Sequence, residues 1–495
     1  MTNHLHDALF LKSAFSDAPL LHLPDGSVIT RRAFSAHADD LSSALASAGV
    51  ACGDRVAAQV EKSATSLALY AACLRIGAVF LPLNTSYTDD EVGFFLTDCA
   101  ARVLICDPAR VASLARVAEP AGTRVITMAA DGTGGWRDLC HAPSPRTAER
   151  GGDDIAAILY TSGTTGRPKG AILSHDNLLS NAATLVDAWG VTDADRLLHA
   201  LPVFHSHGLF VAGNVCLLAG AQMLYLPKFD ADSVIAAMPD CTMMMGVPTF
   251  YTRLLASDDF TAAVCHHMRL FISGSAPLLE QTHAAFSART GHRILERFGL
   301  TETSMNTSNP FVGDRKPGTV GRPLPGVDLR INTGGTGAVG EIEVRGPNVF
   351  QGYWGLPDQT AEAFTDDGYF RTGDLGTIDE DGYLTIVGRS KDLIISGGLN
   401  IYPKEIEKLI DAQPGVDESA VIGLPDPDFG ERVVAMVVET SKGALDTQLL
   451  QETLRARLAR FKLPKRIVVV DSLPRNVIGK VQKNVMRQDA VAAGW

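Results

Sequence analysis

Along the first 150 residues, stretches with the apolar spacing of a helix alternate with stretches that have the pattern of a strand. They predict an amphipathic helix over Phe34 to Ala48, ended by Gly49, and strands over Arg55 to Val60 and Ala78 to Leu83. Strands separated by helices form parallel sheets through right-handed crossovers, so a layered α/β sheet is expected here. The other elements expected in this stretch are helices over Ala64 to Ile76 and Thr88 to Asp98 and a strand over Val103 to Cys106.

The pattern changes after Gly340, where short alternating strands are joined by glycine turns. Asp-Gly pairs at Asp367-Gly368 and Asp381-Gly382 are typical of hairpin turns. A small β-rich subdomain is expected there. Beyond residue 391 the pattern indicates a compact unit of helices and strands, with a helix beginning near Pro403.

One apolar stretch, Gly208 to Leu226, contains no charged residue and is long enough to suggest a membrane span. Asn214, Gln222 and three glycines interrupt it, and its second half ends at Pro227 as a strand would. A buried helix followed by a buried strand is therefore the preferred interpretation.

Composition and charge narrow the class of protein. A chain of 495 residues exceeds one hydrophobic core, so several domains are expected. The net charge of −12 argues against nucleic acid or an anionic membrane as a partner. Eight cysteines without a CxxC pair indicate reduced thiols, and the N-terminus lacks a basic-then-apolar signal pattern, so a cytoplasmic location is expected.

The segment LYTSGTTGRPKG, Leu159 to Gly170, carries the strongest chemical signal. A buried strand, Ile155 to Tyr160, leads into glycines and hydroxyls that can cradle an anion, and Lys169 adds a positive charge. The segment is not a Walker A loop, because Gly170 follows the lysine and Pro168 lacks an N–H. A flexible surface linker is the alternative. A phosphate-binding loop of another type is favoured, since few linkers follow a buried strand so directly.

The decapeptide Thr161 to Gly170 resembles the phosphate loop of the acyl-adenylate-forming superfamily, which includes acyl-CoA synthetases, adenylation domains and luciferases. The resemblance covers nearly the whole chain. It implies an α/β fold with a large N-terminal domain, residues 1–390, made of layered α/β subdomains and a β-rich subdomain. A small mobile α+β C-terminal domain, residues 391–495, would turn about a hinge at Lys391.

The resemblance also implies an ATP site. Gly274 to Ala276 would lie along the adenine and the acyl group, Phe298 would stack on adenine, and Asp374 would accept both ribose hydroxyls. Glu302 would hold Mg²⁺ together with Thr165, because a carboxylate is a hard oxygen ligand; a structural glutamate in a turn is the alternative. The remaining implied ATP contacts are Thr161, Ser162, Gly163, Thr164, Gly166, Lys169, Ser275, Thr301 and Arg389.

Two further features lie in the last hundred residues. A lysine on a tail loop is normally a solvated charge, yet Pro474-Arg475-Asn476 and Gly479-Lys480-Val481 resemble the segment whose lysine reaches the acyl carboxylate and the α-phosphate. Lys480 is therefore expected to be catalytic. Gly397 and Gly398 are expected to let the pantetheine of CoA pass close to the backbone.

The acid site is inferred from a second group of segments. His205 matches the histidine that borders the acyl pocket in the family, and His207 lies where pockets for apolar acids commonly carry an apolar residue. Zinc is disfavoured, because no Cys, Asp or Glu lies near these histidines. Arg253 is either a helix-surface arginine or the cation that pairs with a second carboxylate.

Three segments, TFYTRLL, LFISGSAPL and TETSMNTSNP, resemble the malonyl-CoA synthetases of the superfamily. That resemblance implies a malonate site with Arg253, His207, Ser275 and Met305. The implied activity is ATP-dependent ligation of malonate to CoA through malonyl-AMP, with methylmalonate possible as a second substrate. The alternatives are an acyl- or aryl-CoA ligase for another acid, and a non-catalytic nucleotide-binding protein of the same fold.

Overall fold

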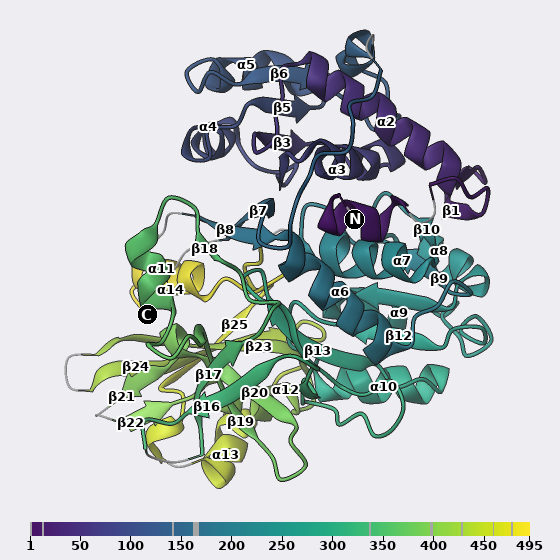
Figure 1. Ribbon diagram of the computed structural model, residues 1–495. Helices are drawn as coiled ribbons and strands as arrows, with labels where there is room; N and C mark the ends of the chain where they lie inside the picture. The colour runs from purple at the N-terminus through teal and green to yellow at the C-terminus, as the bar shows by residue number, and fades with distance from the viewer. Residues whose placement is uncertain are drawn as a thin grey trace. The chain divides into compact units, whose positions relative to one another are not determined.

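The computed structural model describes residues 2–11, 14–140, 143–161, 168–335, 338–396, 399–426, 429–458, 460–476 and 479–495. These residues form two compact units (Figure 1). The first unit comprises Met1–Pro317, Gly321–Asp328 and Val344–Phe370, and the second comprises Gly318–Val320, Leu329–Glu343 and Arg371–Trp495. The β-rich segment that follows Gly340 is therefore divided between the units, with Val344–Phe370 in the first and the residues before and after that range in the second.

A seven-stranded sheet in the first unit confirms the predicted α/β pattern. Its order is β18-β8-β7-β4-β3-β5-β6, and β4, β3, β5 and β6 pair in parallel, as strands joined by helices should. β7 continues the parallel part, while β8 turns back antiparallel to β7. The strands are β3 (Arg55–Gln59), β4 (Val79–Pro82), β5 (Val103–Cys106), β6 (Arg124–Thr127), β7 (Ile155–Thr161), β8 (Lys169–Ser174) and β18 (Gly352–Tyr353).

The predicted helices of this region are also present, and their ends have local causes. Ser63 and Ser66 form a capping box that begins α3 (Ala64–Ile76), which ends at Gly77 with a φ of 72°. Thr88 and Glu91 form the same kind of box at the start of α4 (Asp89–Asp98). The other helices here are α1 (His4–Leu9), α2 (Arg31–Ser47) and α5 (Val111–Ala118).

A nine-stranded sheet forms the rest of the first unit, in the order β15-β14-β13-β12-β11-β9-β10-β1-β2. The strands from β13 to β1 pair in parallel, and β14 pairs antiparallel to β13. Its strands are β1 (Pro19–His22), β2 (Val28–Thr30), β9 (Arg196–His199), β10 (Gln222–Tyr225), β11 (Met243–Gly246), β12 (Leu270–Ser273), β13 (Leu295–Leu300), β14 (Ser304–Ser308) and β15 (Arg322–Pro323). The accompanying helices are α6 (His175–Trp189), α8 (Ala231–Ala237), α9 (Pro248–Leu255) and α10 (Glu280–Thr290), while α11 (Pro357–Ala363) contacts β18 of the seven-stranded sheet.

The uncharged stretch from Gly208 folds as expected, into buried helix and then strand. A π-helical segment, η4 (His207–Gly213), continues as α7 (Asn214–Ala219), and β10 follows after Gly220. Among the described residues, no helix combines the length and the apolar character that crossing a membrane requires. The wider helical turn at η4 marks a candidate functional position, because such turns often occur at functional sites.

The second unit contains two sheets. A four-stranded sheet in the order β16-β17-β19-β20 corresponds to the predicted β-rich subdomain, and a five-stranded sheet carries the last hundred residues. Pro403 begins α12, as predicted. The elements are β16 (Asp328–Asn332), β17 (Gly340–Arg345), β19 (Phe370–Ile378), β20 (Leu384–Arg389), β21 (Ile394–Ser396), β22 (Leu399–Ile401), α12 (Pro403–Asp411), β23 (Val416–Asp426), β24 (Gly430–Glu439), α13 (Thr447–Arg457), β25 (Arg466–Val470) and α14 (Lys483–Ala492).

A buried ion pair ties α12 to α14 in the second unit. The Glu407 carboxylate lies 2.5 Å from Lys483 Nζ and accepts the backbone N–H of Val421 at 2.9 Å. Burial by itself would raise the pKa of Glu407, but the charges of Lys483 and Lys404 and these hydrogen bonds hold it below its usual value. The carboxylate is therefore charged in the folded protein at neutral pH.

Replacing this carboxylate is expected to destabilise the second unit. Glu407→Gln leaves Lys483 without its buried counter-ion, so the free energy of unfolding should fall by about 3 kcal/mol. On the same helix, exposed Glu405 lies 2.7 Å from Lys462 Nζ, and Glu405→Gln should cost less than about 1 kcal/mol. Urea unfolding of both variants measures the difference, and equal losses would contradict this account of Glu407.

Candidate active site

The base of the predicted phosphate loop is formed by β7 and β8. Thr161 and Lys169 are register partners across this antiparallel pair, so the two strands bring the ends of the loop together. Lys169 Nζ lies 4.9 Å from the centroid of the Tyr353 ring, an arrangement that stabilises a cation. The loop residues Ser162, Gly163, Thr164, Thr165 and Gly166 lie outside the described residues, and their roles stay predictions.

Glu302 lies beside the base of this loop, although 141 residues separate it from Thr161. Its Oε1 accepts the Thr161 hydroxyl at 3.4 Å and the Tyr353 hydroxyl at 3.2 Å. The position follows from the fold: the chain leaves β13 at Leu300, and Phe350 N donates to the Glu302 carbonyl at 2.7 Å. A hard oxygen ligand is thus held where it can serve a cation bound to phosphates.

The described residues contain no cluster of three or more His, Cys, Asp or Glu side chains that could hold a metal by themselves. A single carboxylate at the phosphate loop nevertheless fits Mg²⁺, since this ion usually takes one or two carboxylates and completes its shell with water and substrate phosphates. Glu302 therefore has suitable chemistry for that ion.

The ends of β12 and β13 bring the predicted adenine and acyl residues together. Gly274, Ser275 and Ala276 follow β12, and Ser275 has a φ of 70°, which is uncommon for a residue with a side chain. Ser275 Oγ lies 3.2 Å from His207 Nδ1 in η4. Phe298 is buried in β13. Its stacking on adenine stays a prediction.

A cavity adjoins these residues. It is lined by apolar and polar side chains from four parts of the first unit: Pro82 at the end of β4 with Leu83, Asn84 and Tyr87 after it, Leu159 and Tyr160 on β7, Phe204 with His205, and Thr301. Two of the predicted residues, His205 and Thr301, therefore face one space. Met305 follows Thr301 by four residues and is buried on β14. Its backbone N–H donates to Asn181 Oδ1 at 3.2 Å.

His207 is buried and His205 half-buried, and both are uncharged at neutral pH. Burial lowers the pKa of His205 to about 4, and burial together with the positive charge of Arg297 lowers the pKa of His207 well below its usual value. Neither Nε2 atom has a hydrogen-bond partner among the described residues. Unsatisfied buried polar atoms are rare, so this region is suited to a polar ligand.

Arg253 lies on the exposed side of a helix, which agrees with its interpretation as a helix-surface arginine. Phe250, Tyr251 and Leu254 form the buried face of α9, while the Arg253 side chain is exposed. An exposed guanidinium keeps its water and has no need of a buried anion. The role of Arg253 as the cation that pairs with a second carboxylate stays a prediction.

A second group of predicted residues gathers in the second unit. Asp374 on β19 and Arg389 on β20 are register partners, and Arg389 Nε lies 2.9 Å from Asp374 Oδ1. Burial raises the pKa of Asp374, and the charges of Arg389, Lys480 and Lys391 oppose that rise. The sequence predicted these four residues separately, and the fold brings their charges together.

Lys480 is half-buried, and its backbone N–H donates to Asn476 Oδ1 at 2.9 Å. Burial and the neighbouring Arg389 charge lower the pKa of the Lys480 amine to about 8. The predicted hinge, Lys391, is exposed between Ser390 and Asp392, and the expected boundary at residue 391 stays a prediction. Gly397 and Gly398 lie outside the described residues.

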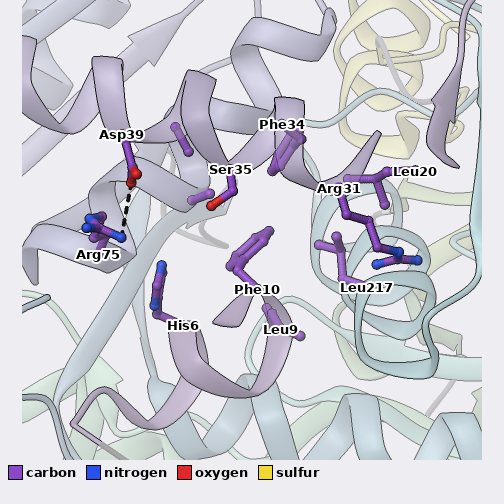
Figure 2. A pocket seen from close by; sticks show the side chains of 12 residues that line it. His6, Leu9, Phe10, Leu20, Arg31, Phe34, Ser35, Asp39, Arg75 and Leu217 are labelled. Carbon is purple, nitrogen blue, oxygen red and sulfur yellow. Dashed lines mark ion pairs between the residues drawn. The ribbon is translucent and has the colours of Figure 1, made fainter. Parts of the chain in front are cut away.

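A different cavity lies among α1, α2, α3 and α7 (Figure 2). Figure 2 shows Phe10, Phe34 and Leu217 facing this space and an ion pair at its edge, where Arg75 Nη1 lies 3.0 Å from Asp39 Oδ1. None of the predicted site residues lines it. The cavity is mainly an apolar packing space, although His6, Ser35 and the Arg75–Asp39 pair also line it.

Both parts of the chain match families of known proteins, and a solved structure is similar over nearly the whole chain. Residues 12–354 match the family described as AMP-binding enzyme, and residues 405–480 match the AMP-binding enzyme C-terminal domain. The crystal structure of ATP-bound MatB from Rhodopseudomonas palustris is 52% identical, covers 99% of each chain and superposes with a TM-score of 0.96.

Two curated relatives are named as ligases. A malonate–CoA ligase of Arabidopsis thaliana is 37% identical over 83% of this chain and 74% of its own length. A probable CoA ligase of Humulus lupulus is 42% identical over 68% of this chain, and the match spans 61% of the length of that relative.

The lowered pKa of Lys480 is open to direct measurement. The neutral amine is the form that reacts with acetic anhydride, so acetylation of Lys480 should reach half its maximal rate near pH 8. The exposed Lys442 provides a comparison in the same digest, read by mass spectrometry. Acetylation of Lys480 that begins only above pH 10 would contradict the burial described here.

Proposed function

The chain belongs to the AMP-binding enzyme family, and from that premise we propose that it is an ATP-dependent malonate–CoA ligase. Malonate, ATP and CoA would give malonyl-CoA, AMP and pyrophosphate through malonyl-AMP. The observation that carries the ligase chemistry is the carboxylate of Glu302 beside the Thr161 end of the glycine-rich loop. Similarity to the malonate–CoA ligase of Arabidopsis over 83% of the chain supports the choice of acid.

Two half-reactions follow from the chemistry of a carboxylate. A carboxylate is a poor acyl donor, because its leaving group would be oxide. Attack of its oxygen on the α-phosphorus of ATP forms the acyl-AMP and releases pyrophosphate. The CoA thiol then attacks the acyl carbon, and AMP leaves. Catalysis of the first step is chiefly a matter of position and charge, since negative charge spreads over the phosphoryl oxygens.

The first unit supplies the triphosphate contacts of the proposal. The loop hydroxyls and N–H groups of residues 161–166, together with Lys169, would bind the phosphates. Glu302, with Thr165, would hold Mg²⁺, which when bound neutralises developing phosphate charge. Phe298, Thr301 and residues 274–276 would contact adenine and the adjoining acyl group.

The second unit supplies the remaining contacts. Asp374 would accept both ribose hydroxyls, and Arg389, already paired with it, would orient that carboxylate. Lys480 would donate to the acid and to the α-phosphate during adenylation. Gly397 and Gly398 would let pantetheine pass close to the backbone. Rotation of the C-terminal residues about Lys391 would take place between the two half-reactions.

The acid would bind near the end of β12. Ser275 and His207 already share a hydrogen bond there, and their polarity suits a short dicarboxylic acid better than an alkyl chain. Met305 would limit the length of the acid. A methyl group contributes only about 1–3 kcal/mol of discrimination, so methylmalonate is proposed as a second substrate.

Removing Lys480 should separate the two half-reactions. Lys480→Ala is expected to lower malonyl-AMP formation about 10²- to 10³-fold, because a charged contact to the transition state is lost. Thioester formation from supplied malonyl-AMP and CoA should stay within a fewfold of the wild-type rate. Pyrophosphate release and malonyl-CoA formation measure the two steps, and equal losses in both would refute the role assigned to Lys480.

The choice of acid is tested by pyrophosphate release with ATP, Mg²⁺ and CoA. We expect turnover with malonate and methylmalonate and little with acetate, succinate, octanoate or 4-coumarate. Strong turnover of the monocarboxylic acids would leave the ligase chemistry intact and reject malonate. No turnover with any acid would favour a non-catalytic nucleotide-binding protein of the same fold.

A further inference from the structure

Lys62 is a buried lysine that the reaction scheme above does not use. It stands between β3 and α3, and its Nζ lies 2.8 Å from His199 Nδ1 and 2.7 Å from the His199 carbonyl oxygen. The same Nζ lies 4.3 Å from the centroid of the Tyr225 ring. Burial lowers the pKa of Lys62 well below its usual value. Lysine is seldom buried at such a cost, so the contacts that it makes with His199 indicate a specific role.

The hydrogen bonds of His199, at the end of β9, fix which of its ring nitrogens carries the proton. Its Nε2 lies 2.8 Å from the Gly208 carbonyl oxygen, which can only accept, so Nε2 carries the hydrogen. Burial and the neighbouring Lys62 lower the pKa of His199 well below its usual value, so the ring is neutral at neutral pH. Nδ1 is then an acceptor, and the Lys62 amine donates to it. A chain of hydrogen bonds therefore runs from Lys62 through His199 to the backbone of η4.

The carbonyl at the end of this chain belongs to the wide helical turn that carries His207. At the end of η4 the Asn214 N–H donates to the carbonyl of Leu209, five residues back along the chain. A side chain that enters the hydrogen-bond ladder of a helix distorts its turns, and His199 bonds to the second residue of η4, Gly208. The bond from His199 thus accounts for the local shape of this turn.

The same turn delivers His207 to the acid site of the proposed reaction. Ser275 Oγ lies 3.2 Å from His207 Nδ1, and Ser275 itself is held at a φ of 70° after β12. Gly208 directly follows His207, so a shift of the Gly208 peptide also moves the histidine side chain. The orientation of His207 beside Ser275 therefore depends on the hydrogen bond that its neighbour receives from His199.

We propose that Lys62 and His199 are positioning residues of the ligase, which hold the wide turn of η4 and so fix the orientation of His207 in the acid site. The inference rests on the proposed function, in which the acid binds near His207 and Ser275. His199 acts through the Gly208 peptide, and Lys62 acts through His199. Loss of either side chain is expected to weaken binding of the acid more than binding of ATP, because the triphosphate contacts come from other elements.

Removing the Nε2 donor tests this dependence. His199→Phe keeps a ring of similar size but donates no hydrogen bond, so the Gly208 carbonyl loses its partner. The KM for malonate is expected to rise about 10- to 100-fold, since a displacement of about 1 Å in a binding group has effects of this size, while the KM for ATP stays within about threefold of wild type. Initial rates of pyrophosphate release at saturating CoA give both constants.

Two further variants distinguish the hydrogen bonds from simple packing. In His199→Gln the carboxamide can donate to the Gly208 carbonyl and accept from Lys62, so the KM for malonate should return to within about fivefold of wild type. Lys62→Met keeps the length of the side chain without its amine. It should raise the KM for malonate, though less than His199→Phe, because the imidazole still faces Gly208.

His283 on α10 provides the matched control. It is buried, and its Nε2 lies 3.2 Å from the Ile294 carbonyl oxygen, so His283→Phe removes a bond of the same kind. The temperature of unfolding should fall in His283→Phe as in His199→Phe. The KM for malonate in His283→Phe should nevertheless stay within about threefold of wild type, since this bond lies outside η4.

The outcomes separate the inference from its premise. Malonate ligation by the wild-type protein with an unchanged KM in His199→Phe and Lys62→Met would overturn the inference alone, as would equal rises in the KM for malonate and for ATP. An equal rise in His283→Phe would also overturn it, because the effect would then follow stability. Wild-type protein that ligates another acid instead of malonate would overturn the proposed choice of acid, and the KM values for that acid would still decide the role of the pair. Lys62→Met carries the same comparison if His199→Phe does not fold.

Discussion

The cost of burying charge governs the functional parts of this protein. Charged groups leave water only where a partner replaces their hydration, and the second unit follows that rule: Glu407 is paired with Lys483, and Asp374 with Arg389. In the first unit Arg297 is buried without an anionic partner among the described residues. Arg297 is therefore a residue whose burial has a free-energy cost that no hydrogen bond to Nε or Nη2 from the described residues offsets.

The sheets explain how distant parts of the chain reach one site. Parallel strands end at a common edge, so β12 and β13 deliver Gly274 and Ser275 close to the residues that follow Leu300. The antiparallel return of β8 along β7 sets the ends of the glycine-rich loop, and Glu302 reaches Thr161 there. The same architecture places the wide turn of η4, with His207, against Ser275.

Most of the secondary structure could be predicted from the sequence, because apolar spacing and capping residues are local. The helix over Ala64 to Ile76 begins and ends where the pattern indicated, with Ser63 and Gly77 at its ends. The start of α6 is set by an equally local device, because Ser174 caps the helix and Asn177 returns the second bond of a capping box. The sequence does not show which side chain is the N-cap of such a helix, because several polar residues that could cap it stand next to one another.

The local sequence pattern does not predict which of two arginines is buried. Arg253 and Arg297 each stand in a mostly apolar segment, and sequence alone cannot tell which guanidinium faces solvent. The turn of α9 puts Arg253 outside, whereas β13 is buried on both of its faces from Leu295 to Phe298, so Arg297 lies inside. A signal was present in Gly274, whose missing side chain leaves space for Arg297, but that space is defined only when the two strands pair.

The sequence by itself determined the helices and strands and the family, and it supplied the proposed roles of the loop, of Glu302 and of Lys480, because these depend on neighbouring residues and on short motifs. Only the tertiary structure decided which charges are buried, which are paired, and which are left without a partner. Burial is a property of the packed chain, and the free energy of a charge depends on everything that replaces water around it.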